Sequence, residues 1–127
     1  DLKNGERLVS LKEGIQEAEV ISLHASGVQT ILDTRIFEIM RPGMIVLNSA
    51  RGELIDEEAL VKALESGVVQ AAWIDVFTQE PYTGPLTGFE QTLLTPHVST
   101  YTRQCRSSME ESAARNLLRD LFGALAP

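Results

Sequence analysis

The sequence predicts an α/β fold in which helices cover both faces of a parallel β-sheet. Short apolar segments alternate along the chain with segments whose apolar residues recur at the spacing of an amphipathic helix. The links between them are short, and several contain glycine or proline. Such alternation is typical of right-handed strand-helix-strand crossovers. At 127 residues the chain has the length of about one domain.

The first half of the chain contains a helix at residues 9–18, a strand at 20–24, a helix at 34–40 and a strand at 44–47. The first helix begins near Ser10, with Glu13 as its partner in a capping box. The second helix stops before Pro42 and Gly43, because neither residue continues a helix well. Both strands are apolar, so we expect them to be buried in the sheet.

The second half contains a helix from Asp56 to about residue 66, a strand at 68–76, a loop at 78–90, a strand at 92–94 and a helix at about 102–122. Asp56 is the expected N-cap, and Gly67 provides the left-handed stop. The loop has roughly a dozen residues, a length that in a compact domain is usually functional or disordered, and we expect a functional loop. The last helix carries an apolar stripe that includes Cys105, so we expect a buried thiol.

The composition narrows the class of partner. A net charge of −7 argues against a nucleic-acid surface, which needs clustered basic residues. No apolar run is long enough to span a bilayer, and no signal peptide opens the chain. Cys105 is the single cysteine, so the chain cannot form an internal disulfide and is compatible with a reducing compartment. Two histidines make a weak case for a metal, and we expect none. These features predict a cytoplasmic protein whose partner is a small molecule or another protein.

Candidate site residues follow the carboxyl ends of the expected strands: Ala25, Arg51, Asp75 and His97. Parallel strands end at one rim of the sheet, where open α/β sheets bind ligands. A guanidinium at this rim offers a planar, two-pronged grip on a carboxylate or phosphate. For Arg51 the alternative is a structural ion pair with Glu53 or Glu57.

The long loop adds a carboxylate, Glu80, that could accept a hydrogen bond from a ring nitrogen of His97. Such a partner leaves the other ring nitrogen as a proton donor near neutral pH. An arginine that holds an acid and a histidine that moves a proton suit the interconversion of a 2-hydroxy acid and a 2-oxo acid, with a cofactor handling the hydride. A purely structural hydrogen bond is the alternative for this pair.

Three motifs occur in order: residues 47–57 (LNSARGELIDE), residues 73–81 (WIDVFTQEP) and residues 94–97 (LTPH). Together they closely resemble the D-isomer-specific 2-hydroxyacid dehydrogenases, with phosphoglycerate dehydrogenase and its relatives as the nearest group. The resemblance implies that Arg51 holds the carboxylate and carbonyl of the substrate. It also implies that Glu80 and His97 form the acid/base pair.

The resemblance further implies a nicotinamide cofactor, NAD, with NADP not excluded. Asp75 matches an aspartate near the nicotinamide carboxamide, and Ser49 and Ala50 lie where the backbone runs beside the cofactor. His24 and Ala25 belong to a loop near the adenosine half. For His24, a rim position without ligand contact is the alternative.

One motif of NAD-binding domains is missing from this sequence. The pyrophosphate is held by a GxGxxG turn into a helix, and no two of the nine glycines stand two positions apart. The sequence therefore resembles the second half of a doubly wound, Rossmann-like domain that lacks its first βαβ unit, and residues 1–127 form this partial domain. Asp1 is a candidate for the acidic ribose-binding residue. We expect the fragment alone to be inactive.

The strand at 20–24 would pair with the missing first strand, so we expect an open apolar edge and self-association as a homodimer. A second hypothesis for function is a non-catalytic, NAD-responsive protein-binding module, as in some transcriptional corepressors that resemble this family. Arg51, Glu80 and His97 would be present in both. Turnover of a 2-hydroxy or 2-oxo acid distinguishes the two.

Overall fold

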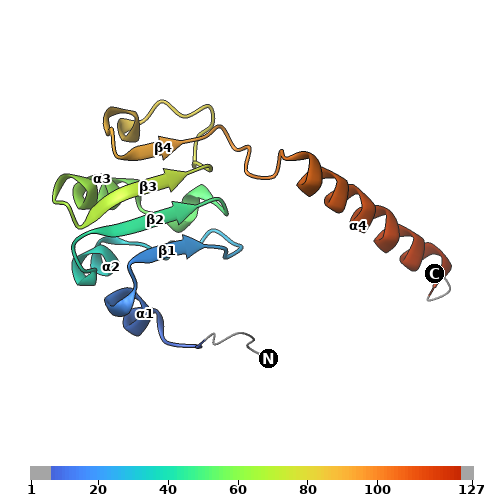
Figure 1. The fold of residues 1–127 in the computed structure, drawn as a ribbon, viewed down its shortest axis with the longest axis horizontal. Coiled ribbons are helices and arrows are strands. Elements are labelled where there is room, and N and C mark those ends of the chain that lie inside the picture. The colour runs from blue at the N-terminus through green and yellow to red at the C-terminus, as the bar shows by residue number, and fades with distance from the viewer. Residues whose placement is uncertain (1–6, 124–127) are drawn as a thin grey trace. The chain divides into compact units, whose positions relative to one another are not determined.

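A computed structural model describes residues 7–123, and its elements follow the predicted order (Figure 1). The helices and strands are α1 (Leu11–Glu17), β1 (Val20–Leu23), α2 (Thr34–Ile39), β2 (Met44–Asn48), η1 (Gly52–Leu54), α3 (Glu57–Glu65), β3 (Val69–Ile74), η2 (Pro85–Gly88), β4 (Thr92–Leu94) and α4 (Arg103–Phe122), where η marks a 3-10 helix. The chain divides into two compact units, Asp1–Pro96 and His97–Pro127. The ribose-binding candidate Asp1 lies outside the described residues.

The first unit is built on a four-stranded parallel sheet in the order β1-β2-β3-β4. Successive strands are aligned at their carboxyl ends, with Asn48 opposite Ile74 and Ile74 opposite Leu94. The prediction of an α/β fold with a parallel sheet is confirmed. Within the described residues β1 pairs with β2 alone, and Val20 on this edge strand is 50% exposed.

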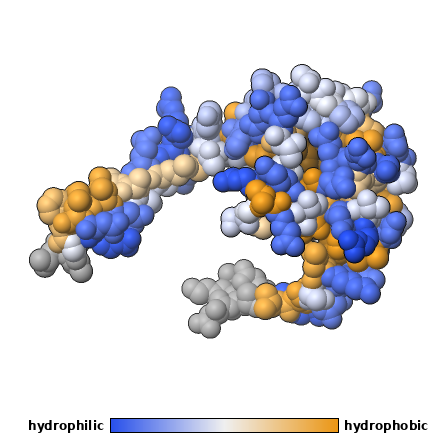
Figure 2. Space-filling view, turned by 180° about the vertical axis from the view of Figure 1, so that it is seen from behind, coloured by the Kyte–Doolittle hydropathy of each residue, from blue (hydrophilic) through white to orange (hydrophobic). Residues whose placement is uncertain are grey.

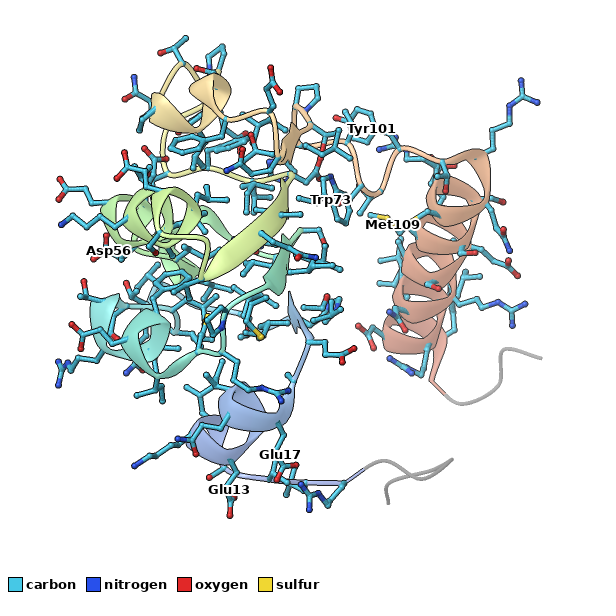
Figure 3. The ribbon with its side chains drawn as sticks, turned by 60° about the vertical axis from the view of Figure 1, so that its left-hand side comes forward. Glu13, Glu17, Asp56, Trp73, Tyr101 and Met109 are labelled. Carbon is cyan, nitrogen blue, oxygen red and sulfur yellow. The ribbon has the colours of Figure 1, made fainter. Side chains whose placement is uncertain are left out.

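Within this unit, α1, α2 and α3 lie on the same side of the sheet (Figure 3). Met44 and Val46 point to that side and are buried, whereas Val20 and Leu93 on the opposite side are 50% and 61% exposed. The expectation of helices on both faces is therefore wrong for the described part of this unit. The strand order never reverses, and right-handed crossovers between successive strands place their helices on one side.

Local sequence explains where the helices begin and end. Ser10 and Glu13 form the predicted capping box of α1. The Asp56 carboxylate accepts a hydrogen bond from the Ala59 N–H at 3.1 Å and so caps α3. Beyond α3 the chain turns at Gly67, whose φ of 74° is in the left-handed region that glycine adopts readily.

The second unit contains α4, which is capped by the side chain of Thr102. None of the described residues of α4 is buried, and apolar side chains gather toward its C-terminal end (Figure 2). Cys105 is only half-buried, so the expectation of a buried thiol is wrong. Apart from α4, the second unit contains no described helix or strand that could pack on the apolar stripe of α4. In residues 7–123 no helix combines the length and the apolar character needed to cross a bilayer.

Candidate functional site

The loop after β2 is held by a buried asparagine. Asn48 is 1% exposed, its Oδ1 accepts a hydrogen bond from the Ala50 N–H at 3.1 Å, and its Nδ2 donates to the Arg51 carbonyl at 2.8 Å. Both ends of the side-chain amide therefore bind the backbone of the turn that presents Arg51. Sequence reasoning noted Asn48 only as a strand end. The available signal was an asparagine directly after a buried strand, where its side chain can replace backbone partners.

The Arg51 side chain is exposed at this rim. One of its nitrogens, Nη1, donates to the Ala50 carbonyl at 2.7 Å. Within residues 7–123 no ion pair joins Arg51 to Glu53 or Glu57, so the alternative of a structural ion pair is wrong. A guanidinium has five N–H donors, and those not used by Ala50 are available for an anion.

Gly52 joins the arginine loop to the segment after β3. A Cβ at residue 52 would overlap the backbone carbon of Phe77 and the backbone nitrogen of Thr78. Backbone atoms cannot move aside as a flexible side chain can, so only glycine allows this approach. The arginine loop and the start of the 78–90 loop are thus packed directly against each other.

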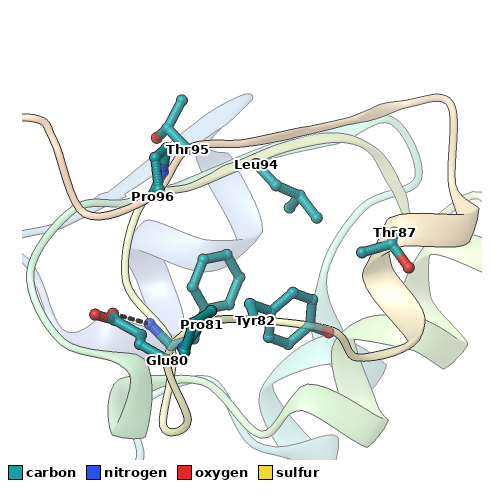
Figure 4. A pocket seen from close by; sticks show the side chains of 8 residues that line it. Glu80, Pro81, Tyr82, Thr87, Leu94, Thr95 and Pro96 are labelled. Atoms are coloured by element: carbon teal, nitrogen blue, oxygen red, sulfur yellow. Dashed lines mark hydrogen bonds between the residues drawn. The ribbon is translucent and has the colours of Figure 1, made fainter.

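Glu80 is held at the start of that loop. The Phe77 N–H donates to Glu80 Oε1 at 3.0 Å (Figure 4). The Phe77 ring stacks on the Tyr82 ring, with centroids 4.1 Å apart and planes 17° apart. Tyr82 Oη accepts a hydrogen bond from the Leu86 N–H at 3.2 Å. These contacts fold the segment from Phe77 to Tyr82 into a tight loop that carries the Glu80 carboxylate.

Burial raises the pKa of Tyr82 to about 12. The hydrogen bond from Leu86 opposes this shift, and a hydrogen bond to Glu57 at the start of α3 adds to it. The phenol therefore stays protonated at neutral pH and ties the loop to α3.

A cavity of about 550 Å³ lies beside Glu80 (Figure 4). Its lining residues are Phe77, Glu80, Pro81, Tyr82, Thr87, Leu94, Thr95 and Pro96. Most of this wall is apolar, with the Glu80 carboxylate as its charged group. All of these residues belong to the first unit.

Asp75, the residue directly after β3, is fully buried, with 0% exposure. Its Oδ1 accepts a hydrogen bond from the Thr95 hydroxyl, and the Thr95 oxygen in turn accepts one from Nε1 of Trp73 at 3.0 Å. The Asp75 N–H donates to the Asn48 carbonyl at 2.9 Å. The buried carboxylate is thereby fixed between the ends of β2 and β4.

The other predicted site residues follow β1, β2 and β4. Ser49 and Ala50 are half-buried directly after β2. His24 and Ala25 are exposed after β1, and Nε2 of His24 lies 2.8 Å from Oγ of Ser22. His97 opens the second unit, with an unusual left-handed φ of 56°.

The first unit thus brings Ser49, Ala50, Arg51, Asp75 and Glu80 to the carboxyl ends of its strands. Within the described residues no group of three or more His, Cys, Asp or Glu side chains is arranged to hold a metal ion.

The comparisons with known proteins identify a family. The profile described as "D-isomer specific 2-hydroxyacid dehydrogenase, NAD binding domain" matches residues 1–99. A glyoxylate reductase of Thermofilum pendens is 36% identical over 118 residues, which are 89% of this chain and 35% of that protein. A hydroxypyruvate reductase of Blautia hydrogenotrophica is 37% identical over 123 residues, which are 93% of this chain and 38% of that protein.

Solved structures give the same result. The crystal structure of a glyoxylate reductase from Paecilomyes thermophila matches with a TM-score of 0.81 and 35% identity, over 90% of this chain and 36% of that one. The chain spans 35% to 38% of the length of these three proteins.

Proposed function

Because the chain belongs to the D-isomer-specific 2-hydroxyacid dehydrogenase family, we propose that it is the catalytic part of an NAD(P)-dependent oxidoreductase that interconverts a D-2-hydroxy acid and a 2-oxo acid. The observation that carries the proposal is Arg51. Its guanidinium is exposed, its backbone is held by Asn48, and no carboxylate pairs with it in the described residues. A cation presented in this way suits the carboxylate of a small acid.

The roles of the site residues are proposals of the same kind. Arg51 binds the substrate carboxylate, and His97 gives or takes the proton at the oxygen of the reacting carbon. Glu80 is the carboxylate that accepts a hydrogen bond from the imidazole. Support for these roles comes from the order of the three motifs along the chain and from the tight loop that holds Glu80.

The residues present fit the nicotinamide half of the cofactor. A buried carboxylate on Asp75 can accept an amide N–H, and the half-buried backbone of Ser49 and Ala50 can lie along the ring. His24 and Ala25 would contact the adenosine half. When bound, the cofactor supplies the hydride chemistry, whereas Arg51 and His97 orient the acid and move the proton.

Relatives named glyoxylate reductase and hydroxypyruvate reductase make small 2-oxo acids the first substrates to examine.

The edge of β1, with Val20 half exposed, supports a homodimer. A free cysteine, Cys105, agrees with a reducing, cytoplasmic location.

The test is steady-state kinetics of the full-length protein with NADH or NADPH and either glyoxylate or hydroxypyruvate. Arg51→Lys should lower kcat/KM roughly tenfold or more, because lysine keeps the charge but loses the two-pronged grip. Arg35→Lys is the matched control, since the Arg35 side chain is 90% exposed on α2. Equal kcat/KM values for the two variants would contradict the role of Arg51.

The corepressor-type binding module is retained as the alternative. A full-length protein that binds NADH and a protein partner, yet reduces neither 2-oxo acid, would favour it over the enzyme.

A further inference from the structure

Three side chains at the carboxyl ends of β3 and β4 form one chain of hydrogen bonds. Nε1 of Trp73 donates to Oγ1 of Thr95 at 3.0 Å, and Oγ1 of Thr95 donates to Oδ1 of Asp75. We propose that Thr95 is a positioning residue that orients the Asp75 carboxylate for the nicotinamide cofactor, and that Trp73 orients the Thr95 hydroxyl. This inference rests on the proposed function, in which Asp75 contacts the cofactor.

The sheet register brings these residues together. Ile74 pairs with Leu94, so the next residues along, Asp75 and Thr95, are opposite each other. Trp73 stands two residues before Asp75, so both side chains point to the same face. The backbone fixes Thr95 as well, because its N–H donates to the Ile74 carbonyl at 3.1 Å. Neither end of this hydrogen-bond chain depends on a mobile surface side chain.

Hydrogen-bonding chemistry fixes the direction of the chain. An indole N–H can only donate, and a threonine hydroxyl has a single hydrogen. Since Trp73 donates to the Thr95 oxygen, the Thr95 hydrogen is left to point at Asp75. Oδ1 of Asp75 is therefore the acceptor at the end of this chain.

Burial makes this donor important. Asp75 is 0% exposed, and a buried carboxylate is costly unless donors surround it. Hydrogen bonds to a charged group are also stronger and more directional than neutral ones. Loss of the Thr95 hydroxyl should therefore change how Asp75 presents its carboxylate, and it should do so without removing any group that contacts the substrate.

The first experiment measures NADH dissociation constants of the full-length protein by calorimetry. Thr95→Val keeps the branched shape and removes the hydroxyl, so we expect roughly tenfold weaker binding. Thr95→Ser restores the hydroxyl and should bind like the wild type. Thr92→Val is the matched control, because the Thr92 hydroxyl donates to the carbonyls of Leu86 and Phe89, at 2.8 Å each, and not to Asp75.

The second experiment uses the single tryptophan of the chain, whose indole N–H gives one resonance in a ¹H–¹⁵N spectrum. In Thr95→Val this resonance should shift, because the acceptor of the indole hydrogen bond is lost, whereas in Thr95→Ser and Thr92→Val it should keep its wild-type position.

The outcomes separate this inference from the proposed function. NADH binding and an indole resonance that respond to Thr95→Val no more than to Thr92→Val would overturn the proposal. If Thr95→Val does not fold, Trp73→Phe replaces it, and unchanged NADH binding in that variant overturns the role of Trp73. A wild-type protein that binds no NADH refutes the proposed function and the positioning role together, while the indole resonance still decides whether the hydrogen-bond chain exists.

Discussion

Gly52 packs against the backbone of Phe77 so closely that a Cβ at residue 52 would overlap the Phe77 backbone carbon. Gly52 directly follows Arg51, and the Phe77 N–H holds the Glu80 carboxylate at 3.0 Å. This contact therefore links the loop that carries Arg51, the proposed substrate anchor, to the loop that carries Glu80, the proposed partner of His97. Two segments about 25 residues apart in sequence share one rigid support.

Gly52→Ala should destabilise the 127-residue chain by roughly 1–3 kcal/mol, because the added methyl meets backbone atoms that cannot rotate away. Urea unfolding measures this loss. Gly88→Ala is the control, since a Cβ at Gly88 meets nothing within 4 Å. Similar midpoints for the two variants would show that the two loops are not tightly packed.

Asn48→Ala should cost about 1–3 kcal/mol of stability, because it removes two hydrogen bonds from a buried turn and leaves the backbone groups of Ala50 and Arg51 unpaired. In the full-length protein it should also raise the KM for the 2-oxo acid by loosening Arg51. Asn116→Ala is the control on exposed α4, where the Asn116 side chain accepts a hydrogen bond from Arg119 on the same helix. A KM unaffected by Asn48→Ala would argue against this positioning of Arg51.

Tyr82 gives a prediction for alkaline pH. Its pKa in the folded chain is about 12, against an ordinary value of 10.0. The neutral phenol is favoured by folding, so its stabilising effect is fully present below pH 10 and is lost as the pH rises toward 12. Denaturant unfolding from pH 9 to 12 should show this loss in the wild type and in Tyr101→Phe, and a smaller loss in Tyr82→Phe. Identical pH dependence of all three proteins would contradict the assignment.

The open edge of β1 predicts self-association of the 127-residue chain at micromolar concentration. Val20→Lys should weaken it, because lysine on an edge strand opposes pairing with another strand. Val28→Lys is the control, since Val28 is 79% exposed but lies outside the sheet. Light scattering that finds the wild-type chain monomeric would rule out this edge as a dimer contact.

The 127-residue chain should bind NAD weakly or not at all, because its sequence contains no GxGxxG turn for the pyrophosphate. Calorimetry with the isolated chain measures this. Low-micromolar affinity would mean that the nicotinamide side alone suffices for binding.

Much of the fold could be predicted because its signals are local. The capping box at Ser10 and Glu13, the cap at Asp56, the turn at Gly67 and β4 at Thr92–Leu94 were all predicted, and the structure has each of them. Periodicity and capping depend on neighbours within one turn or strand, so a single sequence carries them. The three motifs at residues 47–57, 73–81 and 94–97 likewise identified the family, because each is contiguous in the chain.

The tertiary structure decided what depends on contacts between distant segments. The sequence names Asn48, Gly52 and Thr95, but it does not say that one holds the Arg51 turn, another meets Phe77 and the third binds Asp75. It also led to wrong expectations for a buried Cys105 and, in the described part of the first unit, for helices on both faces of the sheet. Local patterns specify which residues form an element, whereas burial and hydrogen-bond partners follow from how the elements pack, and packing is not encoded in any single segment.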